Sequence, residues 1–263
     1  MVSASDVQAL RRATGAGMLD AKKALEEADG DVERATRLLR ERGLASAAKR
    51  VDRDNAEGAV ALSLLEDRAG AIVELRCETD FVAKAQDFVN TANELAATVA
   101  TDGEQAVAKF ESIIEDLRLS LKENIALGRV VHFAAGDGDV VSGYLHVQAD
   151  RGVNAVLVQL HGGTAELAHD IALHIAFARP RYLSRADVPA EEVERERETF
   201  EVQARNSGKP EAALAKIVEG RLDGFFKEIC LLDQAFVKDE KRKIHDVLAG
   251  ASVVRFAQVE IGR

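Results

Sequence analysis

The chain turns from a strand pattern to a helix pattern within the stretch ELRCETDFVAK, residues 74–84. A β-type run occupies residues 72–77. After it, apolar side chains recur at helical spacing and share one face: Phe81, Ala85, Phe88, Ala92, Leu95 and Val99. The stretch therefore predicts a strand and then a helix from near Phe81 to about Ala100, with Thr79 and Asp80 at the corner between them.

The corner residues each allow two interpretations. Thr79 or Asp80 is a typical helix N-cap, whose side-chain oxygen accepts an otherwise unpaired backbone N–H. Phe81 lies on the apolar stripe, which favours the core, but it also lies at the helix tip, where an aromatic ring can protrude. The residues alone predict a carboxylate and an aromatic ring side by side at an exposed corner.

The same order of elements occurs twice. Strand patterns at 59–65 and 71–77 flank a turn at 66–70, and the helix described above follows. Strand patterns at 143–148 and 155–160 flank a second turn, and a helix pattern at 164–178 follows. Asp67-Arg68 and Asp150-Arg151 fall at matching points, which indicates an internal duplication. Strands followed by a helix in each half predict an α+β fold with two related core subdomains, residues 55–140 and 141–263.

A helix from Phe110 to Leu127 and a strand from Arg129 to Ala134 are predicted to complete the first subdomain. Residues 188–230 are predicted to form an antiparallel helical hairpin inserted into the second subdomain. Its first arm, residues 191–198, is mostly charged, and the turn is Asn206-Ser207-Gly208-Lys209-Pro210. An arm with such a thin apolar stripe is expected to project from the body.

Residues 1–54 form a separate N-terminal module and linker in this interpretation. Three short helix patterns are divided by Thr14-Gly15-Ala16-Gly17 and by Asp29-Gly30, and Gly43 is predicted to stop the third. The pattern resembles a ubiquitin-associated three-helix bundle, in which the Gly-Ala-Gly-Met turn presents an apolar patch. Met18 and Leu19 are either part of that patch or part of the core. Residues 44–55 are expected to be a linker or a frayed helix.

The bulk composition excludes several classes of protein. A formal net charge of −10 argues against a nucleic-acid-binding protein, which normally has a basic face. Two cysteines in apolar surroundings, Cys77 and Cys230, predict a reduced, cytoplasmic protein. No signal peptide and no apolar run of about 20 residues are present, so no membrane association is expected.

The sequence has no phosphate-binding loop, and His169 and His174 are spaced unfavourably for a metal pair. We therefore predict no cofactor and no metal.

Two stretches carry a resemblance to a known family. The stretch at 74–84 resembles the signature of the elongation factor Ts family, nucleotide-exchange factors for the GTPase elongation factor Tu. A second stretch, LRRATGAGMLDAKKAL at residues 10–25, is similar to that family's N-terminal module. The resemblance extends through nearly the whole chain, including the helical hairpin. The family usually has Asn where this chain has Arg76, and some members have a further helix after the final strand.

The resemblance implies a function and a set of site residues. The chain would bind elongation factor Tu with GDP and promote GDP release, without a chemical active site of its own. Thr79, Asp80, Phe81 and Val82 would dislocate the magnesium and phosphate site of the GTPase. The other partner-binding residues would be Leu10, Met18, Leu19, Ile125 and His146. The number of copies in the assembly is left open.

Two alternatives belong to other classes. The first is a ubiquitin-associated-type scaffold that binds an apolar peptide and has no exchange activity. The second is a hydrolase that uses Cys77 as a nucleophile with a nearby histidine. Cys77 alternates with Val73 and Leu75 along one strand face, so it is most simply a small buried hydrophobic residue.

Overall fold

The computed structural model describes residues 2–48, 50–208 and 210–262 of the chain. Lys49 of the predicted linker and Lys209 of the predicted hairpin turn lie outside the described residues. The first half contains α1 (Ala4–Thr14), α2 (Met18–Glu27), α3 (Val32–Ala48), β1 (Glu57–Leu65), β2 (Ala69–Cys77), α4 (Asp80–Ala83), α5 (Gln86–Asp102), the 3-10 helix η1 (Glu104–Phe110), α6 (Glu111–Leu121) and β3 (Ala126–Ala134). The second half contains β4 (Asp139–Gln148), β5 (Arg151–His161), α7 (Ala165–Ala178), η2 (Arg185–Asp187), α8 (Ala190–Asn206), α9 (Glu211–Ile229), η3 (Leu231–Asp233), β6 (Ala235–Phe236), β7 (Asp239–Lys243), α10 (Ile244–Leu248) and β8 (Ser252–Glu260).

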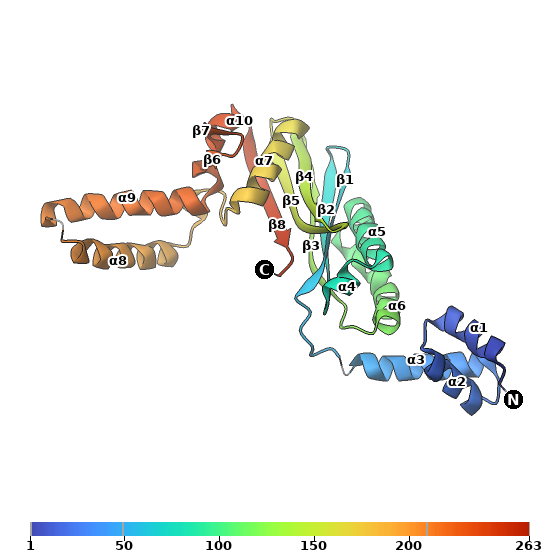
Figure 1. Cartoon of the computed structure of the whole chain (residues 1–263). Helices are drawn as coiled ribbons and strands as arrows, with labels where there is room; N and C mark the ends of the chain where they lie inside the picture. Colours follow the sequence, from blue (N-terminus) through green and yellow to red (C-terminus); the bar gives the residue numbers. More distant parts are fainter. Residues whose placement is uncertain (1, 49, 209, 263) are drawn as a thin grey trace.

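Two three-stranded antiparallel sheets form the centre of the molecule (Figure 1). Their strand orders are β1-β2-β3 and β4-β5-β8, so the two sheets share one topology. Helix α5 packs on β1 and β2, α7 packs on β4 and β5, and the sheets contact each other through β1 and β5. The layers are therefore helix, sheet, sheet, helix, and the predicted α+β class is confirmed.

Three buried apolar clusters hold these layers together. Between α5 and the first sheet, Phe88, Leu95 and Val99 pack against Val73 and Leu75. A second cluster lies between the sheets and a third lies under α7. Six consecutive residues of β2 are buried, because one face of this strand meets α5 and the other meets the second sheet. Each fully buried aliphatic side chain of this kind contributes about 1.5–3 kcal/mol.

The helix predicted from Phe81 to Ala100 is wrong in one respect, because it is two helices. α4 ends at Ala83, and Ala85 adopts an extended conformation with ψ 135° before α5 begins. The break rotates α4 relative to α5, so the two helices do not share one continuous face. Phe81 consequently leaves the apolar stripe and is 82% exposed, whereas Phe88 is fully buried.

Two other predicted boundaries are also wrong. Gly43 does not stop the third helix, since α3 continues to Ala48. A glycine inside a helix costs only about 1 kcal/mol, and a Cβ at Gly43 would lie 2.7 Å from Cδ2 of Leu119 on α6. The predicted helix from Phe110 to Leu127 ends at Leu121, because Lys122 adopts the left-handed conformation with φ 60°. Residues 122–125 form a loop that leads into β3.

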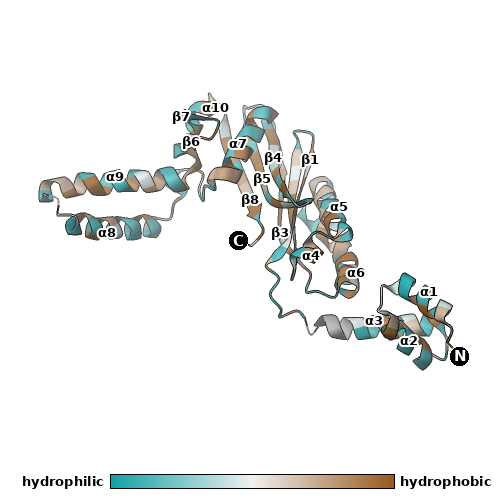
Figure 2. Ribbon diagram, in the orientation of Figure 1, coloured by the Kyte–Doolittle hydropathy of each residue, from teal (hydrophilic) through white to brown (hydrophobic). Residues whose placement is uncertain are grey.

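Helices α8 and α9 form the predicted antiparallel hairpin, which projects away from the sheets (Figure 1). Figure 2 shows that most of α8 is hydrophilic. A small cluster of Ala204, Val218 and Leu222 joins the two arms. A separate cluster of Val188, Ile229 and Cys230 closes the base. The two arms therefore pack on each other, and the cluster at the base joins the hairpin to the rest of the fold.

We expect the body to fold without the arms of this hairpin. If residues 190–227 are replaced by a short Gly-Ser linker, circular dichroism should lose only the helix signal of the two arms. The melting transition should stay cooperative, since the base cluster of Val188, Ile229 and Cys230 is retained. Loss of cooperative melting would show instead that the arms are required for the core.

A buried histidine connects α7 to the segment that follows the hairpin. His174 is 1% exposed. Its Nδ1 accepts the Val237 N–H at 3.2 Å, so its Nε2–H donates to Oε1 of Gln234 at 3.0 Å. Burial lowers the pKa of His174, and the Gln234 hydrogen bond offsets part of this effect. The neutral ring is therefore the form that the fold accommodates.

This arrangement predicts acid sensitivity. An unfolded histidine takes up a proton near pH 6.5, but folded His174 has a lower pKa, so unfolding is coupled to proton uptake below that pH. The stabilising contribution of His174 is complete above about pH 6.5 and declines as the pH falls. Thermal melts between pH 7.5 and pH 5 should therefore show a steeper loss of stability for the wild type than for His174→Gln. Parallel curves would contradict the prediction.

Candidate partner-binding site

The corner at Thr79 joins β2 to α4 through a helix cap. Thr79 is the N-cap, with φ −126° and ψ 152°, and its hydroxyl oxygen accepts the Val82 N–H at 3.4 Å. Of the two candidate caps, the structure selects Thr79. The carboxylate of Asp80 is left for another interaction.

Glu123, from the loop after α6, holds the backbone of this corner. Its Oε2 accepts the N–H groups of Glu78 at 2.9 Å and of Thr79 at 3.1 Å. Its Oε1 accepts the hydroxyl proton of Thr79 at 2.5 Å. Three hydrogen bonds to one carboxylate fix both the chain direction and the cap, since bonds to a charged acceptor are stronger than neutral ones.

Glu78 completes the attachment in the opposite direction. Its Oε1 accepts the N–H of Asn124 at 2.7 Å, and its Oε2 lies 3.3 Å from Arg53. The corner and the loop at 122–125 are thus joined by reciprocal carboxylate-to-backbone bonds. Sequence reasoning missed Glu123, because no local pattern marks it and its segment has a helical pattern in the sequence.

Phe81 protrudes from the corner, next to the exposed Thr79 and the partly exposed Asp80. The Phe81 ring is 82% exposed, whereas Ala83 in the same short helix is fully buried and Val82 packs against the core. Asp80 pairs with Lys84 one turn later, with Oδ2 and Nζ 2.6 Å apart. The hydrogen bond from Lys84 lowers the pKa of Asp80, so the carboxylate is ionised at neutral pH.

Ile125 and Leu10 do not lie on the surface. Ile125 is fully buried in the cluster under α5, and Leu10 is 1% exposed in the core of the N-terminal helices. Neither side chain can contact a partner directly in this conformation. Ile125 instead fixes the loop that carries Glu123, and Leu10 packs under α2.

Met18 and Leu19 lie at the start of α2, after the glycine turn. They are 49% and 74% exposed, so neither is a core residue. The next residue, Asp20, lies 3.9 Å from Lys122, which precedes Glu123 in the chain. A cavity of about 850 Å³ lies between the N-terminal helices and α6. The exposed apolar pair is therefore placed at the same end of the molecule as the corner.

His146 is exposed near the end of β4 and stacks on Tyr144, with ring centroids 6.5 Å apart. The following β4–β5 turn lies near the corner, because Arg151 donates to the Gly58 carbonyl and pairs with Glu57 at 3.0 Å. Glu57 is in turn the strand partner of Cys77. The structure therefore places Phe81, Met18 and Leu19 at the end of the molecule where the β4–β5 turn and His146 also lie.

The two thiols are poor nucleophiles. Both cysteines are buried, and burial raises the pKa of Cys77 to about 12 and that of Cys230 to about 11. A thiol with such a pKa is protonated at neutral pH, whereas the thiolate is the reactive form. Within the described residues, no group of three or more metal-ligating side chains could hold an ion. The same residues include no helix with the length and hydropathy of a membrane span.

Comparison with known proteins assigns this arrangement to a family. The family model described as Elongation factor TS matches residues 78–263, a range that begins at the corner. The elongation factor Ts of Acidothermus cellulolyticus is 47% identical over 273 residues, which cover 98% of each chain. The chain belongs to the elongation factor Ts family. Members from Clavibacter michiganensis and Streptomyces griseus are 45% identical and cover 99% of this chain and 98% of theirs.

The resemblance seen in the two motifs is thus confirmed, and the chain is one of the elongation factors of protein biosynthesis. The relatives extend over the N-terminal helices, which the family model does not include. Arg76 forms a local ion pair. Its guanidinium donates to both oxygens of Glu74, at 2.8 and 3.1 Å, and neutralises a carboxylate that is only 2% exposed.

Proposed function

We propose that this protein binds GDP-loaded elongation factor Tu in the cytoplasm and accelerates GDP release. The observation that supports this most directly is the exposed Phe81 ring on a corner that is rigidly attached to the body. A ring that is 82% exposed is free to insert into a partner, where its burial would remove apolar surface from water. Membership of the elongation factor Ts family supports the identity of that partner.

The proposed mechanism acts on the magnesium and phosphate site of the GTPase. Magnesium bridges the nucleotide phosphates and offsets their charge, so its displacement weakens nucleotide binding. Phe81 would insert between packed side chains and shift the helices that support the ion. Asp80, kept anionic beside Lys84, would compete with the phosphates electrostatically. Thr79 and Val82 would hold these two side chains in position.

Glu123 has a positioning role in this proposal. A corner that is ordered before binding loses less conformational freedom when it enters the partner. The three hydrogen bonds of Glu123 provide that order. Ile125, which is buried in the same loop as Glu123, residues 122–125, would act on the partner only through Glu123.

The remaining contacts would come from two other parts of the chain. Met18 and Leu19 would grip the same GTPase domain from a ubiquitin-associated-like module, residues 1–54, whose core includes Leu10. His146 would contact a different part of the partner. We further propose that residues 55–140 and 141–263 are duplicated subdomains, the second carrying hairpin 188–230, because both contain a three-stranded sheet of the same order.

The test is release of a fluorescent GDP from purified elongation factor Tu, followed by stopped flow at several magnesium concentrations. The full-length protein should accelerate release, and the acceleration should be largest when magnesium is abundant. Deletion of residues 1–54 should weaken binding measured by calorimetry. Binding of the GTPase without faster release would instead identify a scaffold and would contradict the proposal.

A further inference from the structure

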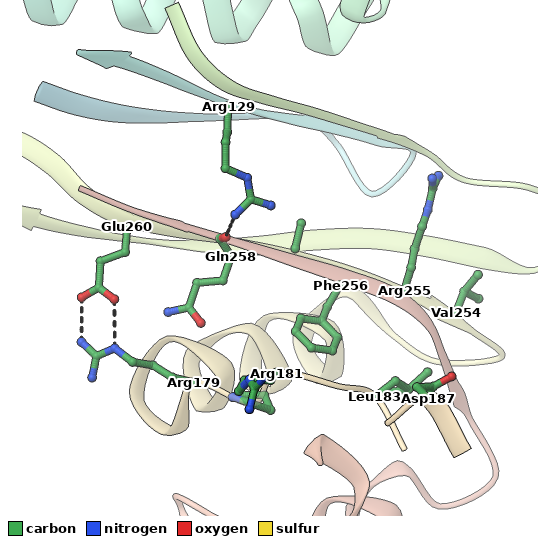
Figure 3. A pocket seen from close by; sticks show the side chains of 12 residues that line it. Arg129, Arg179, Arg181, Leu183, Asp187, Val254, Arg255, Phe256, Gln258 and Glu260 are labelled. Atoms are coloured by element: carbon green, nitrogen blue, oxygen red, sulfur yellow. Dashed lines mark hydrogen bonds and ion pairs between the residues drawn. The ribbon is translucent and has the colours of Figure 1, made fainter. Parts of the chain in front are cut away.

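The last strands of the two sheets lie together along one open edge of the molecule. β3 is an edge strand of the first sheet, and β8 is an edge strand of the second. Arg129 on β3 crosses between them and donates from Nη1 to the carbonyl of Gln258 on β8 at 2.9 Å (Figure 3). One side chain therefore joins the two edges.

A groove of about 600 Å³ follows β8 on this side. Its apolar walls include Leu183, Phe256 and Val254, the last of which is 46% exposed. Two carboxylates line it, Glu260 and Asp187, and Asp187 accepts the N–H and the hydroxyl proton of Ser184. Four arginines line it as well: Arg129, Arg179, Arg181 and Arg255. This density of positive charge is unexpected on a chain with a net charge of −10.

The four arginines divide into two kinds. Arg179 forms two hydrogen bonds with Glu260, and Arg181 pairs with Glu192, so both are neutralised within the fold. Arg129 and Arg255 have no ion pair with a carboxylate among the described residues. Arg255 donates to the amide oxygen of Gln159 at 2.7 Å and lies over the Phe133 ring, 4.1 Å from its centroid. These two guanidinium groups are held in place, and no carboxylate of the described residues balances their positive charge.

Both of these arginines are next to β-bulges, which redirect side chains. In β3, Gly128 and Arg129 together oppose Glu74, and the Glu74 carboxylate accepts the Arg129 N–H at 2.9 Å. A Cβ at residue 128 would collide with that carboxylate. In β8, the extra residue is Val254, immediately before Arg255.

The backbone of β8 offers hydrogen-bonding groups to the groove. Ile261 donates to Val153, so by strand alternation Phe256 and Gln258 direct their N–H and C=O groups away from β5. The Arg129 contact with the Gln258 carbonyl agrees with this direction. Within the described part of the chain, the outward N–H and C=O of Phe256 have no partner. Unpaired edge groups of this kind are a template for another strand.

We propose that this groove binds an extended segment of a partner protein, in which acidic and apolar residues alternate, as a strand added to β8. Side chains of an added strand point alternately to the two faces of the sheet. Those on the face turned toward the first sheet would meet Arg129 and Arg255. Those on the other face would meet Phe256 and Leu183. Backbone bonds provide affinity in this mode, and the side chains provide specificity.

A phosphate polymer fits the groove less well than an acidic peptide. It would use the two guanidinium groups but would leave the outward backbone groups of Phe256 unpaired and the apolar wall uncovered. The peptide uses all three features. This inference does not rest on the exchange activity proposed above, because the groove includes none of the corner residues.

The probe is a fluorescein-labelled octapeptide of alternating Glu and Val, measured by fluorescence anisotropy with the full-length protein at low salt. The double variant Arg129→Gln and Arg255→Gln should bind it at least about tenfold more weakly, since it loses two charge-assisted contacts. Glutamine keeps a donor for the Gln258 carbonyl. A matched peptide of alternating Lys and Val should not bind the wild type.

The matched control is a second double variant on the hairpin, Arg195→Gln and Arg221→Gln. Arg195 also donates to a backbone carbonyl, that of Glu191, and Arg221 also donates to a side-chain amide, that of Gln203. Both double variants remove two positive charges, and both alter the same two kinds of hydrogen bond. Unchanged peptide affinity in the hairpin variant would support the groove, and an equal loss would overturn it in favour of general charge attraction.

N-methylated peptides test the strand addition without altering the protein. One version is methylated at every Val nitrogen and the other at every Glu nitrogen, so each removes the donors along one edge of the peptide. Exactly one version should lose binding, because only one edge faces β8. Equal behaviour of the two versions would overturn the proposal. So would tighter binding of an octathymidylate, or self-association of the protein that the groove variant abolishes.

Discussion

Phe81→Ala is expected to slow the GDP release that this protein stimulates in elongation factor Tu by about tenfold or more. Burial of an aromatic side chain in a partner contributes about 2 kcal/mol, and about 1.4 kcal/mol corresponds to a factor of ten in rate. The melting temperature of the variant should stay unchanged, because the ring is 82% exposed in the free protein. Stopped-flow release of a fluorescent GDP and thermal melts measure the two effects.

The control is Val202→Ala, which removes an apolar side chain that is 55% exposed on the helical hairpin. This variant should release GDP at the wild-type rate. Asp80→Asn adds a test of charge alone, since Thr79 and not Asp80 caps the helix, and its effect should be smaller than that of Phe81→Ala. If Phe81→Ala melts early and loses activity only in proportion to unfolding, the ring is a structural residue and the mechanism fails.

Glu123→Ala is expected to reduce stimulated GDP release about tenfold although the residue touches no partner in the proposal. The variant leaves the N–H groups of Glu78 and Thr79 and the Thr79 hydroxyl without their acceptor. The loss of such bonds costs about 1–3 kcal/mol, part of which would appear as a lower melting temperature. The rest of this free-energy cost would appear in the exchange reaction, because the corner must then become ordered during binding.

Two further variants separate positioning from general stability. Glu104→Ala removes a carboxylate that accepts the His132 N–H at 3.2 Å elsewhere on the same unit, so it should lower the melting temperature slightly and leave exchange intact. Glu123→Gln should recover part of the rate, because its amide oxygen can still accept the two backbone N–H groups. Equal exchange defects in Glu104→Ala and Glu123→Ala would show that Glu123 acts only through stability.

The sequence alone was sufficient for the elements whose signal is local. The periodicity of the two strand pairs and their helices, with Asp67-Arg68 and Asp150-Arg151 at matching points, predicted the α+β class. The charge of residues 191–198 and the turn at 206–210 predicted the projecting hairpin. Motifs at 10–25 and 74–84 predicted the family. For the fold class and the hairpin, neighbouring residues in the chain carry the information, through helical spacing, strand alternation or turn chemistry. For the family, the resemblance of the two motifs carries it.

The tertiary structure decided which side chains are available at the surface. Phe81 shares helical spacing with Phe88, but the extended conformation of Ala85 separates the two helices and exposes Phe81. Ile125 and Leu10 are buried, whereas Met18 and Leu19 are both exposed. Spacing gives the relative orientation of residues only within one uninterrupted element, so a break of two residues decides between the buried and the protruding interpretation of Phe81.

The contacts of Glu123 and of Arg129 also required the folded chain. Glu123 reaches the corner across 44 and 45 positions in sequence, and Arg129 reaches Gln258 across 129. Partners at such separations leave no periodic pattern, because their meeting depends on how sheets and loops are stacked. The sequence by itself therefore determined the family, the elements and the corner motif. Only the tertiary structure decided what holds that corner in place and which arginines keep an unpaired charge.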